Sequence, residues 1–175
     1  MEQRKSVFSS ILTPAIVTAL VMIIFSVGTY MANIWMVTGM QWVPYVLLLL
    51  GLIWAIRDRR EKILGGNITF GEGFMTGLVF SLVVSVITAI FGYIMMTMIA
   101  PDMIDEILKM QETKLVEKGL SEEQIATAQR MSAPFMKPPI LMLFGLVFYT
   151  LFGLVASLIV AAIFKKENPN LQQPQ

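Results

Sequence analysis

The chain has 175 residues, of which 56% are hydrophobic and 14% charged, and it contains neither cysteine nor histidine. Soluble domains are about 45–50% apolar and about 25% charged, so this composition argues against a soluble domain and predicts an integral membrane protein. The net charge of +1 gives no reason to expect a nucleic-acid partner. Without cysteine and histidine the chain lacks disulfides, the usual metal ligands and histidine-dependent catalytic groups, so we expect no enzyme, no cofactor and no metal.

Four stretches are long and apolar enough to cross a bilayer, which takes about 20 residues. They are residues 7–32, 36–56, 74–100 and 140–164, and none of them contains an acidic or basic residue. The first is longer than the apolar core of a signal peptide, so we interpret it as an uncleaved anchor. The second is the weakest, because Gly39, Gln41 and Pro44 dilute its first third. The pattern predicts an all-α fold, a four-span helical bundle that forms a single membrane domain over residues 1–175.

Residues 101–139, between the third and fourth spans, are charged and predict a short helical hairpin. Pro101 is placed for a first helical position, and Gly119 is placed to end the first helix. Ser121 and Gln124 then have the spacing of a capping box, which predicts a second helix that ends by Ser132. We interpret the hairpin as resting its apolar side on the outer ends of the spans or on lipid headgroups. The alternative is a docking surface for a partner outside the membrane.

The distribution of Lys and Arg predicts an orientation. Eight of the 13 cations lie at the two ends of the chain and between the second and third spans, whereas five lie in residues 101–139 among seven acidic residues. Basic residues gather on the cytoplasmic side of membrane proteins. We therefore expect a multi-pass protein of the bacterial inner (cytoplasmic) membrane, with both termini cytoplasmic and residues 101–139 periplasmic or external. Trp35, Trp42 and Tyr45 would then lie near the outer interface, and Trp54 near the inner one.

Small residues recur at spacings of four in the last two spans. Small residues at this spacing let two helix backbones approach closely in a membrane. The preferred interpretation is that the third and fourth spans pack on one another, and the alternative is that one series faces another subunit. The candidate packing residues are Gly73, Gly77, Ser81, Ser85 and Ala89 in the third span, and Gly145, Gly153, Ser157 and Ala161 in the fourth, where Tyr149 interrupts the series.

Two polar segments need separate interpretation. The glycines around Glu72 superficially resemble a dinucleotide-binding loop, but no strand precedes them, and Thr69 and Glu72 have the spacing of a capping box at a helix start. The basic run after the second span is either an ordinary topology signal or a contact for anionic lipid, for which the candidates are Arg57, Arg59, Arg60 and Lys62.

Several short runs carry a resemblance to a known family. They are Ile-Thr-Phe-Gly-Glu-Gly-Phe at 68–74, Ala-Pro-Asp at 100–102, Gly-Leu-Ser-Glu-Glu at 119–123, and residues 153–162 before Lys165 and Lys166. Together they resemble a bacterial family of small four-helix integral membrane proteins, described as a domain of unknown function. The resemblance implies a four-span bundle in the inner membrane with no catalytic residues to carry over. It also implies a location beside glycosyltransferases that act on lipid-linked sugars.

These observations predict a non-enzymatic accessory or scaffold subunit of an inner-membrane complex. The resemblance implies a complex that handles lipid-linked sugars. Its expected partners are the lipid bilayer and another membrane protein or a second copy of the chain, with no nucleic acid and no metal. The alternative is a small oligomeric transporter or channel for a small solute or lipid, with a path along hydroxyls such as Ser81 and Ser85. A third hypothesis, an enzyme acting on lipid headgroups, would use Glu72 and the basic run.

Overall fold

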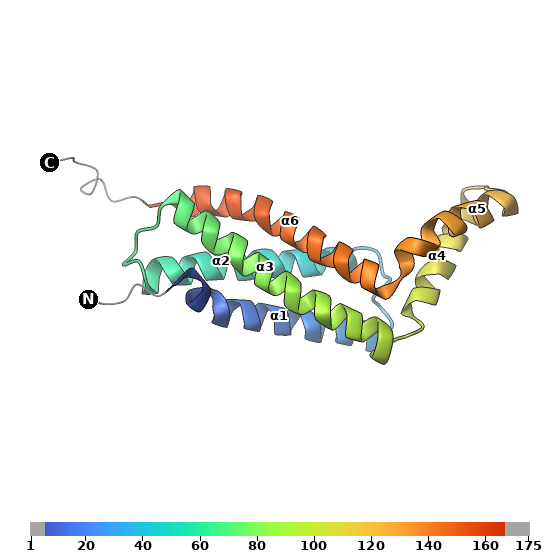
Figure 1. The fold of residues 1–175 in the computed structure, drawn as a ribbon, viewed down its shortest axis with the longest axis horizontal. Coiled ribbons are helices and arrows are strands. Elements are labelled where there is room, and N and C mark those ends of the chain that lie inside the picture. Colours follow the sequence, from blue (N-terminus) through green and yellow to red (C-terminus); the bar gives the residue numbers. More distant parts are fainter. Residues whose placement is uncertain (1–5, 167–175) are drawn as a thin grey trace. The chain divides into compact units, whose positions relative to one another are not determined.

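The computed structural model describes residues 6–166, and within this range it contains six α-helices and no strand (Figure 1). Four helices are long and apolar enough to cross a membrane: α1 (Val7–Met31), α2 (Val43–Lys62), α3 (Phe70–Ile94) and α6 (Pro138–Phe164). Two shorter helices, α4 (Met103–Glu117) and α5 (Glu122–Ser132), follow α3. The predicted all-α fold with four spans is therefore confirmed.

The described residues divide into two compact units, a finer division than the single membrane domain that the sequence predicts. The first unit holds the residues up to Thr88 and those from Leu146 onward, so it contains α1, α2 and most of α3 and α6. The second unit is residues 89–145, with α4, α5 and the remaining ends of α3 and α6.

Apolar side chains from α1, α2, α3 and α6 form one core in the first unit. Its fully buried members include Ile11, Leu48, Leu52, Phe80 and Val84, and α6 adds Ala156 and Val160. The outer faces of the same helices carry large exposed apolar side chains, such as Leu151 and Ile159 on α6. Because a helix that crosses a membrane is apolar on every side, this arrangement agrees with a bundle surrounded by lipid.

The start of α2 differs from the predicted second span. The sequence predicts a span from residue 36, whereas α2 begins at Val43 after a 3-10 turn over Met40–Trp42. Gly39 precedes this turn with a φ of 98°, a left-handed conformation that glycine adopts without a steric penalty. Pro44 lies in the first turn of α2, where its missing N–H is not needed.

A short backbone pairing joins the segment after α2 to the end of α6. The Ile68 N–H donates to the Lys166 carbonyl at 3.0 Å, and the Lys166 N–H donates to the Ile68 carbonyl at 2.9 Å. The start of α3 and the end of α6 therefore lie at one end of the first unit, together with the end of α2 (Figure 1). The side of a membrane that this end faces stays a prediction.

In the second unit the helix boundaries follow the capping signals closely. Gln124 N–H donates to Ser121 Oγ at 3.4 Å, and the Gln124 side chain accepts from the Ser121 N–H at 3.0 Å, so the predicted capping box is confirmed. The helix it begins, α5, ends at Ser132 as expected, and Gly119 after α4 has a φ of 75°. Pro101 does not begin a helix, because α3 continues as a π-helical turn over Met95–Ile99 and α4 starts only at Met103.

Candidate functional site

Small residues of α3 and α6 lie directly opposite one another in the first unit. A Cβ atom added to Gly73 would lie 3.1 Å from the Ala161 Cβ, and one added to Gly77 would lie 2.9 Å from the Ser157 Cβ. One added to Gly153 would overlap the Ser81 side chain. Real Cβ atoms essentially never approach within 3.0 Å, so at Gly77 and Gly153 the two helices are closer than any residue but glycine allows, and the contact at Gly73 is also tight. We call these contacts the α3/α6 seam.

Hydroxyl groups along this seam make hydrogen bonds within the bundle. Ser157 Oγ donates to the Gly153 carbonyl at 2.5 Å, and Ser85 Oγ donates to the Leu82 carbonyl at 2.9 Å. Ser85 Oγ also lies 2.8 Å from Thr150 Oγ1, which links α3 to α6. These hydroxyls therefore satisfy backbone carbonyls or one another, as buried polar groups in a membrane must. Ser81 Oγ is buried without a hydrogen-bond partner among the described residues.

Two predicted packing positions, Ala89 and Gly145, lie outside the first unit. Both belong to residues 89–145. A Cβ atom added to Gly145 would meet no atom of the described residues within 4 Å, so no close contact requires glycine there. In the first unit Thr150, which the four-residue spacing does not include, faces Ser85 instead. Tyr149, one residue earlier, packs on Tyr45 of α2 with ring centroids 5.2 Å apart.

Sequence reasoning missed a second close approach, at Gly51 of α2. A Cβ atom added there would lie 2.7 Å from Thr18 Cγ2 of α1 and 2.9 Å from Phe80 Cζ of α3. Gly51 is the one glycine in the apolar run of α2, and that isolation is the signal that could have identified it. It lets α1, α2 and α3 meet at one level of the bundle.

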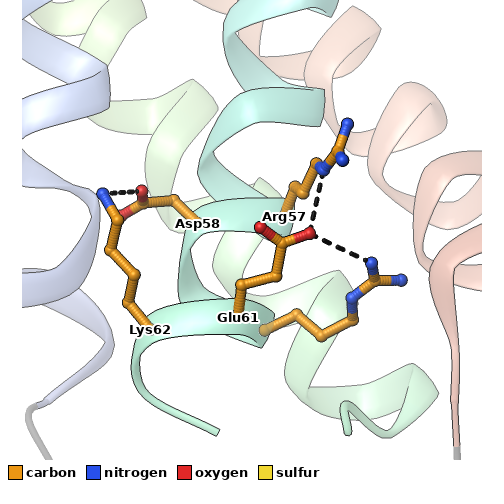
Figure 2. Close-up of polar contacts among 5 residues, drawn as sticks. Arg57, Asp58, Glu61 and Lys62 are labelled. Carbon is orange, nitrogen blue, oxygen red and sulfur yellow. Dashed lines mark hydrogen bonds and ion pairs between the residues drawn. The ribbon is translucent and has the colours of Figure 1, made fainter. Parts of the chain in front are cut away.

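Carboxylates pair with cations of the basic run at the end of α2 (Figure 2). Glu61 Oε1 accepts from Arg57 Nε at 2.9 Å and from Arg60 at 3.3 Å, and Lys62 pairs with Asp58. The Arg57 and Lys62 side chains are 62% and 73% exposed, so these pairs are strongly screened by water and contribute little to stability. Arg60 is less exposed and stacks over the Phe164 ring of α6, 5.5 Å from its centroid.

Arg59 differs from the other three candidates for lipid contact and corrects that prediction. It is only 7% exposed, and its Nη1 donates to Ser10 Oγ of α1 at 2.7 Å. The residue follows Leu48, Leu52 and Ala55 on the buried side of α2, so its guanidinium points into the bundle. The structure thus leaves Arg57, Arg60 and Lys62 as the surface cations of this run.

Glu72 occupies the capping position that the sequence predicts. Its Oε2 accepts from the Thr69 N–H at 3.1 Å, and the Glu72 N–H donates to Thr69 Oγ1 at 3.2 Å. This reciprocal pair holds the first turn of α3. Within residues 6–166, no three acidic side chains lie together as a metal-binding group.

Four packed helices that are long and apolar enough to cross a membrane are compatible with a multi-pass helical membrane protein. Residues 12–166 match the family described as protein of unknown function (DUF4199). This match covers most of the chain. The protein therefore belongs to this family. No curated protein and no solved structure gives a significant match.

Proposed function

We propose that the protein is a non-enzymatic scaffold or accessory subunit of a complex in the bacterial inner membrane. The small residues of the α3/α6 seam pack against one another within one chain. A contact with another protein would then use a different surface. The family resemblance favours a complex that handles lipid-linked sugars as the first candidate.

The surface of the α4–α5 hairpin is the observation that carries the proposal. Val116 of α4 is 57% exposed, Met131 of α5 is 71% exposed, and Phe135, in the 3-10 turn Ala133–Met136 that follows α5, is 53% exposed. The segment that carries them is otherwise rich in charged residues. Exposed apolar side chains rimmed by polar residues mark protein-binding surfaces where they form one continuous patch, so the proposal requires that these side chains share such a patch. The hairpin is also well defined locally, since Gln129 Nε2 donates to Glu112 Oε2 at 3.2 Å and links α5 to α4.

Site-specific photocrosslinking in intact membranes tests this proposal. A photoreactive residue at Met131 or Phe135 is expected to give an adduct with one discrete protein. The same residue at Ile125, which is 8% exposed, is the matched control and is expected to give none. Adducts with lipid alone from both exposed positions would overturn the proposal and favour a hairpin that rests on headgroups. An adduct between two copies of the chain would identify the partner as a second copy.

The transporter alternative depends on the buried hydroxyls of α3 and α6. Thr76, Ser85 and Ser157 each donate to a carbonyl of their own helix, which accounts for their polarity without a permeation path. The α3/α6 seam is also too close to admit a solute beside these groups. Solute flux into liposomes that contain the purified protein, abolished by Ser81→Leu or Ser85→Leu, would instead favour the transporter.

A further inference from the structure

An apolar groove runs between α1 and α2 on the surface of the first unit. Val17 and Val21 of α1 form one wall, and Leu47, Leu50 and Trp54 of α2 form the other. Leu50 is 58% exposed, and Val17, Val21 and Trp54 are each 40–43% exposed, so the groove is open to the surroundings of the bundle. All of these residues lie in helices that are apolar enough to cross a membrane.

The floor of the groove owes its depth to Gly51. Gly51 and Thr18 are both buried there, and the Thr18 side chain packs directly against the Gly51 backbone. With any larger residue at position 51, the side chain would push α1 away or fill the floor. A rise of about 1.5 Å per residue places Leu47 and Trp54 about 10 Å apart along α2, which is the approximate length of the groove.

One end of the groove leads toward the basic end of α2. Trp54 is followed three residues later by Arg57, on the same side of the helix and about 4.5 Å further along its axis. Arg57 is 62% exposed, and its Nε donates to Glu61 Oε1. The surface cations of residues 57–62 are Arg57, Arg60 and Lys62, beside the carboxylates of Asp58 and Glu61. An indole beside a cation is a common arrangement where a helix leaves the hydrocarbon core and meets the headgroups.

We propose that this groove binds one acyl chain of an anionic phospholipid whose phosphate meets Arg57. Two occupants of the groove can be compared by width. An α-helix with its side chains is about 10 Å across and cannot enter a groove between two helices in direct contact, whereas an acyl chain is narrow enough to do so. The apolar lining matches the chain, and the net positive charge of residues 57–62 matches the headgroup. This proposal does not depend on the proposed scaffold function.

Native mass spectrometry of the full-length protein, exchanged from detergent with phosphatidylglycerol, tests the groove. Val17→Trp and Leu50→Trp fill it from its two exposed walls without entering the core, and each is expected to lower the fraction of lipid-bound protein at least fivefold. Ile159→Trp is the matched control, because Ile159 is 57% exposed on α6 and lies outside the groove. Equal lipid retention by wild type and both groove variants would overturn the proposal. Two variants at separate walls keep the test decisive if one of them fails to fold.

A second arm tests the headgroup contact. Phosphatidylcholine is expected to be retained at least threefold less than phosphatidylglycerol by the wild type, and Arg57→Gln is expected to abolish this difference. Lys137→Gln, which removes a cation from the segment between α5 and α6, is expected to leave the difference in lipid retention unchanged. Equal retention of both lipids by the wild type would overturn the assignment of an anionic lipid.

Discussion

Gly77 has no Cβ atom, and this lets α3 approach α6 closely at Ser157. We expect Gly77→Ala to destabilise the protein by about 1–3 kcal/mol, because the new Cβ would force Ser157 away and open the α3/α6 seam. Gly92→Ala on the same helix is the control. A Cβ at Gly92 meets no atom of the described residues within 4 Å, so the change should be neutral or stabilising. Unfolding in mixed detergent micelles measures both, and equal stability of the two variants would contradict the close packing.

The buried Arg59 supplies a second prediction at the residue scale. Ser10→Ala removes the hydroxyl that accepts from Arg59 Nη1, so we expect a loss of about 1–3 kcal/mol in the free energy of unfolding. Ser9→Ala changes an exposed neighbour on the same helix and should cost less than about 0.5 kcal/mol. A thermal-melting series in one detergent compares the two. A cost for Ser9→Ala as large as that for Ser10→Ala would argue against a specific contact.

At the scale of helices, Thr69 and Glu72 begin α3 through a reciprocal pair of hydrogen bonds. Thr69→Ala should lower stability by about 1 kcal/mol and speed hydrogen exchange in the first turn of α3, since one capping acceptor is lost. Glu72→Gln keeps a side-chain oxygen for the Thr69 N–H and should preserve both stability and cellular function. Thr113→Ala, in the interior of α4, is the control. A loss of function in a stably folded Glu72→Gln variant would point to a chemical role for the carboxylate.

The capping signals predicted helix ends well because they act within a few residues. Ser121 and Gln124 fixed the start of α5, and Thr69 with Glu72 fixed that of α3. The start of α2 was predicted too early because the left-handed turn at Gly39 interrupts a stretch that is still mostly apolar. The burial of Arg59 was missed because charge alone suggests exposure. Arg59 follows Leu48, Leu52 and Ala55 on one side of α2, and this helical spacing indicates burial despite the charge.

Tertiary packing was predictable only in part, since contacts between helices depend on which sides face each other. The four-residue series indicated the residues of the seam, because small side chains are informative wherever backbones approach. The series could not predict which residue of α6 lies opposite each residue of α3. Ser85, for example, faces Thr150, which is not a member of the series. The groove between α1 and α2 has no sequence signature, because its walls are aliphatic residues and one tryptophan and its floor is one glycine and one threonine.

At the scale of the whole molecule, the distribution of cations predicts an orientation in the membrane, which can be tested directly. The chain has no cysteine, so a single introduced cysteine is the only possible site for a thiol reagent. Thr113 in α4, and Lys62 and Lys165 at the basic end, are exposed and suit this substitution. In spheroplasts, a membrane-impermeant maleimide is expected to label Thr113→Cys at once.

Lys62→Cys and Lys165→Cys are expected to react with the same reagent only after the membrane is permeabilised. Both positions lie at the end of the first unit where the Ile68–Lys166 pairing joins the loop after α2 to the end of α6, so they must share one side. Labelling of one without the other would contradict that pairing. Immediate labelling of both, with Thr113→Cys protected, would show the opposite orientation, and the contact proposed for the α4–α5 hairpin would then be on the cytoplasmic side.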